Sequence, residues 1–239
     1  MSQNSRKYGF TIIELMLAMS FVSILLIAIA ITVIQMSNIY NKGLMLKNTN
    51  QIGRSIDDEL RRGIASSTQF DVSSLTTINY VEKEWGGRLC IGRYSYIWNY
   101  GKSVKSDNNP TPVLDSDRNK YEAPSTNEIR FVKIYDPSLK YCALEGSTYP
   151  SIPTDAIELL DASQYDLAIQ KFSISSNDSA FDTKTGQRLY NIEFYIGTNN
   201  QTALNGSISC KAPNESGADP SYCSVVRFNI LARAGNLVE

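Results

Sequence analysis

The chain begins with a long apolar stretch. In residues 10–34 only five side chains are not apolar: those of Thr11, Glu14, Ser20, Ser23 and Thr32. As a helix this stretch would be about 37 Å long, whereas the hydrocarbon core of a bilayer is about 30 Å thick. Arg6 and Lys7 precede it, and a basic flank favours a cytoplasmic N-terminus. The pattern therefore predicts a membrane-spanning helix.

Two ordinary explanations account for this stretch less well. A cleaved signal peptide has an apolar region of about 7–15 residues and then a small-residue cleavage site, but residues 35–38 here read Gln-Met-Ser-Asn. A plain signal anchor fits the length but gives no reason for Glu14, since a charge in a spanning helix costs about 2.5–3.5 kcal/mol. Glu14 therefore needs either a partner or a place near the cytoplasmic surface, where it reaches water.

The helical pattern continues to about Ala65. Four aliphatic residues recur every four positions among charged ones, as in an amphipathic helix: Ile52, Ile56, Leu60 and Ile64. No proline occurs between Met1 and Gln69. Three glycines weaken the helix by about 1 kcal/mol each: Gly43, Gly53 and Gly63. Gly43 is the predicted flexible point because it lies between the apolar and amphipathic halves.

Charged residues cluster near the end of this helix. Asp57, Asp58, Glu59, Arg61 and Arg62 are interpreted as a solvated face. The pairs Asp57–Arg61 and Asp58–Arg62 have the i,i+4 spacing that stabilises helices.

After residue 67 short apolar runs alternate with polar turns. Runs rich in Tyr, Ile and Val are separated by Asn, Ser, Gly and Pro, which is typical of antiparallel sheet. The predicted strands are residues 75–81, 88–100, 128–135, 167–175, 188–196 and 224–232. Residues 155–162 are predicted to form a short helix with Thr154 as its N-cap, and the polar residues 102–125 to form a long loop.

Aromatic residues alternate along one of these predicted strands: Tyr94, Tyr96, Trp98 and Tyr100. Such a row can stack bases or sugars. Burial in the core is the favoured interpretation, because each ring buries about 150–250 Å².

An acidic run, Asp115 to Asn119, lies within the predicted loop. Lys120 and Thr126 stand where a calcium loop of the EF-hand type has Gly and Glu. A solvated turn is therefore favoured over a metal site.

Composition removes several classes of function. The 239 residues include no histidine, which excludes Ser-His-Asp triads, Cys-His dyads and histidine metal sites. The net charge of -1 gives no bulk attraction to nucleic acid. No pair of nucleophile and base is evident, so an enzyme on a signal anchor is disfavoured. The sequence predicts no catalytic residue, no metal site and no cofactor.

The first residues of the apolar stretch resemble a known processing motif. Gly9-Phe10-Thr11-Ile12-Ile13-Glu14-Leu15-Met16, after a short basic leader, is similar to the motif of type IV prepilins and type II secretion pseudopilins. The leader, the glycine, the aromatic residue, the threonine and the glutamate are all in register. The resemblance is close over about 25 residues and looser over the rest of the long helix. Many members have a proline midway through the apolar half, where this chain has Ile31 and Thr32.

The resemblance implies a processing site and an assembly role. A membrane peptidase would cut between Gly9 and Phe10 and N-methylate Phe10. Glu14 would meet the N-terminal amine of a neighbouring subunit and set the register of a filament. The implied partners are other pilin subunits, the prepilin peptidase, an inner-membrane assembly platform and, before assembly, membrane lipid. A surface ligand or DNA would be a partner of the head under the alternative of a tip adhesin or DNA-uptake pilin.

All four cysteines follow the apolar stretch: Cys90, Cys142, Cys210 and Cys223. Outside the cytoplasm an even set indicates two disulfides, and four cysteines allow three connectivities. A zinc site is disfavoured because the spacings lack paired C-x-x-C units. The pairs Cys90–Cys142 and Cys210–Cys223 are favoured, the second because it resembles the C-terminal disulfide loop of many pilins.

These predictions together describe an α+β chain, in which a long N-terminal α-helical stalk packs on an antiparallel β-sheet head with long loops. Its regions are a cleaved leader (1–9), a transmembrane or filament-core helix (10–34), an amphipathic continuation (35–66) and an extracytoplasmic head (67–239). The implied function is a structural subunit, a minor pilin, of a type IV pilus or pilus-like filament. A minor pseudopilin of a type II secretion system, or a tip adhesin or DNA-uptake pilin, is the alternative. The expected location is the cytoplasmic membrane with the N-terminus in the cytoplasm, then the cell surface.

Overall fold

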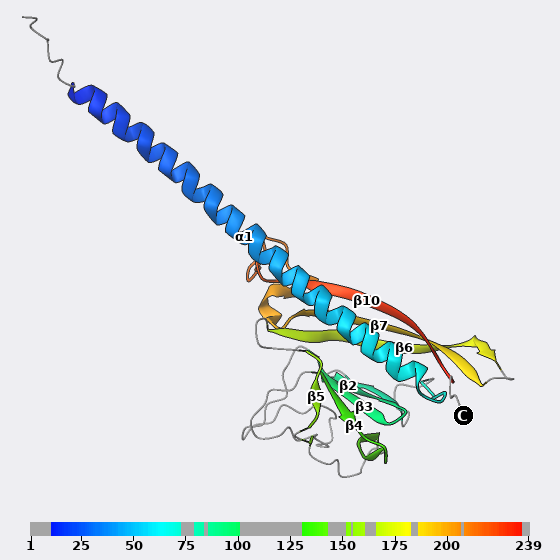
Figure 1. Ribbon diagram of the computed structural model, residues 1–239. Coiled ribbons are helices and arrows are strands. Elements are labelled where there is room, and N and C mark those ends of the chain that lie inside the picture. The colour runs from blue at the N-terminus through cyan, green and yellow to red at the C-terminus, as the bar shows by residue number, and fades with distance from the viewer. Residues whose placement is uncertain are drawn as a thin grey trace, which may run out of the picture. The chain divides into compact units, whose positions relative to one another are not determined.

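One long helix followed by β-strands makes up the chain (Figure 1). The computed structural model describes residues 11–72, 79–83, 86–100, 131–142, 152–153, 155–160, 166–182, 186–206 and 208–235. The chain divides into two compact units that meet inside the helix, between Asn41 and Lys42. We call the second of these, which begins at Lys42, the C-terminal unit. The fold is α+β, with the helix packed on antiparallel sheets, as the sequence predicts.

Helix α1 (Ile12–Ala65) is unbroken over 54 residues. Its predicted end at Ala65 is confirmed, and its predicted first residue, Phe10, lies outside the described residues. The final turn closes on Ser67, whose backbone N–H and hydroxyl both donate to the Ile64 carbonyl, at 3.0 and 2.8 Å. These bonds satisfy a carbonyl that has no partner within the helix.

Burial differs between the two halves of α1. Every residue from Thr11 to Tyr40 is exposed. Beyond Asn41, buried residues recur at steps of three and four: Met45, Thr49, Gly53, Ile56, Leu60, Gly63 and Ile64. This is the predicted apolar stripe, and it begins at Met45, earlier than the sequence pattern placed it.

Two antiparallel sheets form most of the C-terminal unit. The larger has the order β1-β2-β3-β4-β5 and consists of β1 (Tyr80–Lys83), β2 (Gly86–Ile91), β3 (Tyr94–Asn99), β4 (Phe131–Tyr135) and β5 (Ile157–Glu158). The second has the order β10-β7-β6 and consists of β6 (Leu167–Asp182), β7 (Gln187–Thr198) and β10 (Val225–Ala234). The remaining elements are the pair β8 (Leu204–Asn205) and β9 (Ser209–Cys210) and the 3-10 helices η1 (Lys140–Cys142) and η2 (Gln201–Ala203).

One strand prediction and one helix prediction are wrong. Residues 88–100 form two strands instead of one, because a turn at Gly92, whose φ is 59°, reverses the chain between β2 and β3. Residues 155–160 contain β5 instead of a helix. Glu158 Oε1 accepts hydrogen bonds at 2.9 Å from the backbone N–H groups of Phe131 and Leu160, so pairing with β4 outweighs the local helix signal. The predicted loop, residues 102–125, lies outside the described residues.

A large hydrophobic core joins residues 42–65 of α1, which we call the packed half, to both sheets. A row of aromatic rings crosses it from β3 to β10. Ring centroids are 4.2 Å apart for Trp98 and Phe172, 6.3 Å for Phe172 and Phe194, and 5.1 Å for Phe194 and Phe228. This row ends against α1, because the Phe228 ring fills the space beside Gly53.

Candidate functional site

Thr11 and Glu14 close the first turn of α1. Glu14 Oε2 accepts hydrogen bonds from the Thr11 backbone N–H at 2.9 Å and from the Thr11 hydroxyl at 2.8 Å. The Glu14 backbone N–H in turn donates to Thr11 Oγ1 at 3.4 Å. This is a capping box, in which the N-cap and N3 side chains satisfy each other's backbone donors. The T-x-x-E spacing is its sequence signature, so the role of Thr11 was readable from the sequence but is missing from the predictions above.

The other polar side chains of the apolar stretch also bond within the helix. Ser20, Ser23 and Thr32 each donate a hydroxyl hydrogen bond to a backbone carbonyl three or four residues earlier, at 2.7–2.8 Å. Such bonds leave no side-chain donor that needs water. All five polar side chains of residues 11–34 therefore have a partner inside α1.

Large apolar side chains cover the first half of α1. Their exposed fractions run from 45% for Leu25 to 81% for Ile12. The stretch is long and apolar enough to cross a membrane or to serve as a signal sequence. A continuous apolar surface of this size marks contact with lipid or with another protein.

The predicted processing residues precede this half. Gly9 and Phe10 lie outside the described residues. Cleavage and methylation there remain predictions, as does the assembly role of Glu14.

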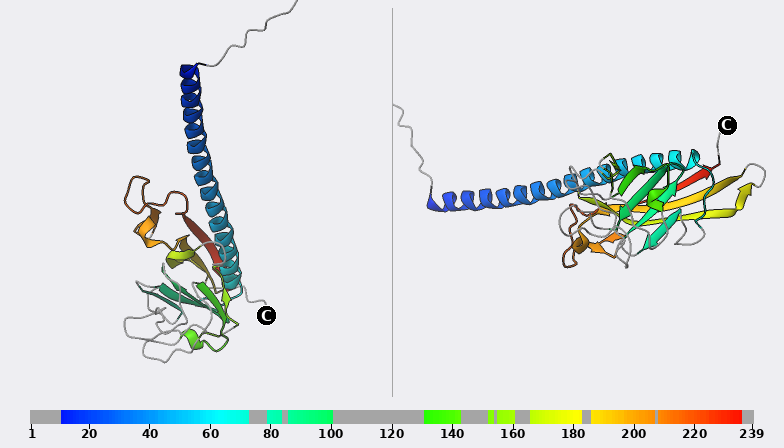
Figure 2. Two further views of the ribbon diagram at one scale, coloured as in Figure 1. Left: turned by 90° about the vertical axis from the view of Figure 1, so that its left-hand side faces the viewer. Right: turned by 90° about the horizontal axis from the view of Figure 1, so that it is seen from below.

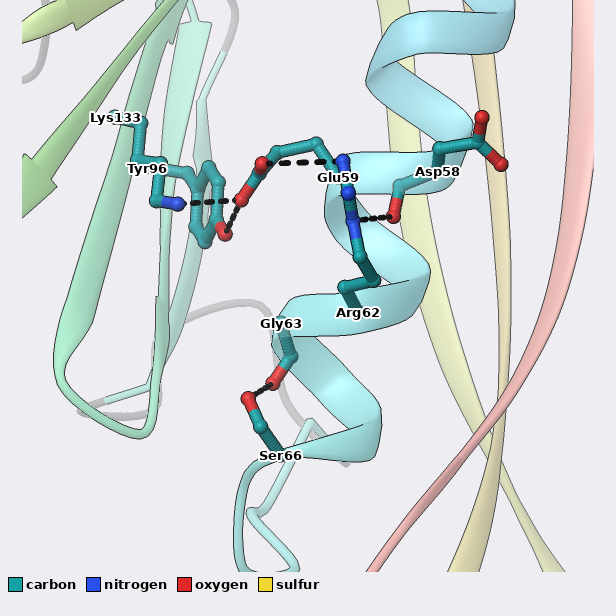
Figure 3. Close-up of polar contacts among 7 residues, drawn as sticks. All are labelled: Asp58, Glu59, Arg62, Gly63, Ser66, Tyr96 and Lys133. Carbon is teal, nitrogen blue, oxygen red and sulfur yellow. Dashed lines mark hydrogen bonds and ion pairs between the residues drawn. The ribbon is translucent and has the colours of Figure 1, made fainter.

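Glu59 connects the packed half of α1 to β3 and β4 (Figure 3). Glu59 Oε1 lies 2.6 Å from Lys133 Nζ and accepts a hydrogen bond of 3.1 Å from the Tyr96 hydroxyl. The guanidinium of Arg62 lies 3.9 Å from the second carboxylate oxygen. Lys133 Nζ also lies 4.0 Å from the centre of the Tyr94 ring, a cation–π distance.

The surroundings keep Glu59 ionised. Burial alone would raise the pKa of this carboxyl group, but the hydrogen bond and the positive charge of Lys133 outweigh that effect, so its pKa is lowered. Burial, together with the Glu59 charge, raises the pKa of Tyr96, so its phenol stays protonated and donates to the carboxylate. Glu59, Lys133 and Tyr96 therefore form a structural ion pair with a supporting hydrogen bond.

The charged cluster near the end of α1 is only partly the predicted solvated face. Asp57 and Arg61 form the predicted pair at 3.1 Å. The predicted side-chain pair of Asp58 with Arg62 is wrong, because Arg62 Nε donates to the Asp58 backbone carbonyl at 3.1 Å and the guanidinium points to Glu59.

A signal for the Glu59 contact was present in the sequence. Lys133 stands between Phe131 and Tyr135 on one face of a strand, and it lies opposite Tyr96 in the sheet. Phe131 on this face is buried, and a partly buried lysine beside it needs an acidic partner. The sequence could not say which acid supplies it.

The cysteines form two disulfides, Cys90–Cys142 and Cys210–Cys223. These are the two favoured pairs. They close loops with sequence separations of 52 and 13 residues, which in the chain-entropy description stabilise by about 4 and 3 kcal/mol. Both bonds therefore act as structural crosslinks of the C-terminal unit.

The alternating aromatic residues from Tyr94 to Tyr100 belong to the core or pack against it, since Tyr94 and Tyr100 are partly buried at its edge. Tyr96 and Trp98 are fully buried, as the favoured interpretation requires, and Trp98 packs edge-on against Phe131. Among the described residues, no three His, Cys, Asp or Glu side chains come together in a group that could hold a metal ion. The acidic run from Asp115 lies outside those residues.

Comparison of the chain with protein-family models, with curated proteins and with solved structures gives no match. The functional assignment therefore depends on the motif, the helix and the disulfide-linked sheets described above.

Proposed function

We propose that this chain is a structural subunit, a minor pilin, of a type IV pilus or pilus-like filament, and that it has no enzymatic activity. The observation that carries the proposal is the first half of α1. Its surface is apolar, and each of the five polar side chains of residues 11–34 makes a hydrogen bond within that segment. Such a helix is equally suited to a lipid bilayer and to a filament core packed from copies of itself.

In this proposal the precursor spans the cytoplasmic membrane with its N-terminus in the cytoplasm. A prepilin peptidase cuts between Gly9 and Phe10 and methylates Phe10. An assembly platform then moves the subunit from lipid into a filament, together with other pilin subunits. The two disulfides fit a head that matures outside the cytoplasm.

In this scheme the Glu14 carboxylate already accepts hydrogen bonds before the subunit is assembled. Before assembly its charge is stabilised by Thr11, and both short bonds end on Oε2. A carboxylate has a second oxygen with its own lone pairs. A neighbour's N-terminal ammonium group can therefore bind Glu14 without first breaking the capping box.

Mass spectrometry of the mature N-terminus tests the proposal. We expect loss of residues 1–9 and a methylated Phe10 in cells that contain the peptidase, and an intact leader in cells that lack it. Gly9→Leu should block cleavage, whereas Ser5→Ala, in the same leader, should not. A leader that remains uncut when the peptidase is present would refute the proposal.

A further inference from the structure

Strand β10 follows the packed half of α1 in the same direction (Figures 1 and 2). Four contacts join the two in the same order along both elements: Lys42 with Cys223, Gly53 with Phe228, Arg61 with Leu231, and Ser67 with Gly235. The helix rises about 35 Å from Lys42 to its end at Ala65, and an extended chain covers about 40 Å from Cys223 to Gly235. The strand therefore matches the packed half of the helix from end to end.

Hydrogen bonds to main-chain atoms fix the two ends of this pairing. At one end Lys42 Nζ donates to the carbonyl of Cys223, just before β10. At the other end the N–H of Gly235, just after β10, donates to the carbonyl of Ser67 at 2.9 Å. The helix and the strand are thus attached at both ends as well as packed between them.

Between the ends, Gly53 and Arg61 contact β10 in different ways. A Cβ atom added at Gly53 would lie 2.0 Å from the Phe228 ring, so glycine lets this ring rest on the helix backbone. Arg61 Nη1 donates to the Leu231 carbonyl at 2.9 Å. Leu231 lies on an edge strand, whose outward carbonyls lack a partner in the sheet.

We infer that β10 is a splint for α1, so that tension along the helix axis is shared by all four contacts. The tension is shared because the strand and the helix run in the same direction. A pull on the N-terminal end of the packed half, opposed at the C-terminal end of β10, displaces the two elements lengthwise and strains every contact at once. A pull on the same end of both elements opens the contacts one after another. This inference does not depend on the proposed filament.

Single-molecule force measurements on the full chain in detergent micelles test the splint. Handles at Asn38→Cys and Arg233→Cys load opposite ends of the pairing, whereas handles at Asn38→Cys and Pro220→Cys load the same end. We expect a rupture force several-fold higher for opposite ends. Equal forces in the two geometries would overturn the inference.

Matched variants test which contacts share the tension. Gly53→Ala should lower the opposite-end force, because the Phe228 ring must move away. Gly43→Ala should leave it unchanged, because nothing lies within 4 Å of the added Cβ. Lys42→Met, which keeps the fold's core intact, should remove the first rupture step in the same-end geometry. An opposite-end force unaffected by both Gly53→Ala and Lys42→Met would contradict the splint.

Discussion

The two halves of α1 share one continuous backbone but differ in what covers them. Up to Tyr40 the apolar side chains are exposed, whereas from Met45 a stripe of apolar and small residues is buried against the sheets. The second half is therefore stabilised by packing against the sheets of the same chain. The first half presents an apolar surface that requires lipid or another protein. Helix propensity does not distinguish these situations, but the width of the apolar face does.

The glycines of α1 show the same contrast on a smaller scale. Gly43 has open space around it, whereas Gly53 and Gly63 have Phe228 and the Tyr96 hydroxyl against them. The last two are required for close packing. Gly43 alone matches the sequence interpretation of a glycine that only weakens the helix.

Truncating a side chain in the packed half should have the largest effect. Leu60 is fully buried, so Leu60→Ala should lower the unfolding free energy of the C-terminal unit by about 2–5 kcal/mol. Chemical denaturation in detergent, followed by the fluorescence of the buried Trp98, measures this loss. Leu26→Ala, at a position with 60% exposure, is the matched control and should leave the transition in place. Similar losses of unfolding free energy for both variants would show that the two halves of α1 do not differ in packing.

Removal of the Lys133 cation that contacts Glu59 should have the next largest effect on stability. Lys133→Met leaves a carboxylate with 20% side-chain exposure without its main partner, at a cost of about 1–3 kcal/mol. Glu59→Gln combined with Lys133→Met removes both charges and should recover part of the loss. A double variant whose loss of unfolding free energy equals the sum of the two single losses would show that the pair contributes little.

The same contact predicts a pH dependence. The pKa of Glu59 is lower in the folded chain than its ordinary value of 4.5. Its stabilising effect is therefore complete above that ordinary value and is lost as the pH falls through the lowered pKa. Denaturation curves at a series of acidic pH values should show a smaller decline in Glu59→Gln than in the unchanged chain. Parallel declines would exclude Glu59 as a source of acid sensitivity.

The two glycines should respond in opposite directions to alanine. Gly53→Ala should destabilise the C-terminal unit by about 1–3 kcal/mol through overpacking against Phe228. Gly43→Ala should stabilise the helix by about 0.5–1 kcal/mol, since it restores helix propensity without a clash. Thermal unfolding of the pair, monitored by circular dichroism, provides the comparison. A stabilising Gly53→Ala would mean that the ring moves aside without cost.

The smallest effect on the C-terminal unit is expected at the far end of α1. Thr11→Ala breaks the capping box and should loosen the first turn by about 0.5–2 kcal/mol. Hydrogen exchange of the Glu14 and Leu15 amides, which donate to the Thr11 hydroxyl and carbonyl, should accelerate, while the unfolding transition of the C-terminal unit stays unchanged. Thr32→Ala, which removes a hydroxyl from the middle of the same half, is the control and should leave those amides protected.

Local patterns predicted most elements of the fold. The four-residue step of Ile52, Ile56, Leu60 and Ile64 indicated the helix face that packs on the sheets, although Ile52 is only partly buried. Alternating runs placed β4, β7 and β10 to within a few residues where they are described, whereas β6 continues seven residues beyond its predicted end at residue 175. The predicted helix at 155–162 failed because strand pairing with β4 is a long-range contact that a local pattern does not contain.

The sequence by itself determined the elements whose cause is local. These are the apolar length of the first half of α1, the T-x-x-E spacing of its capping box and the alternation within the strands, since each depends on neighbouring residues in the chain. Only the tertiary structure decided which acid pairs with Lys133, why Gly53 must be glycine and that β10 lies along α1. Each of these joins residues more than 70 positions apart in sequence, and such contacts arise from packing the core rather than from any local preference.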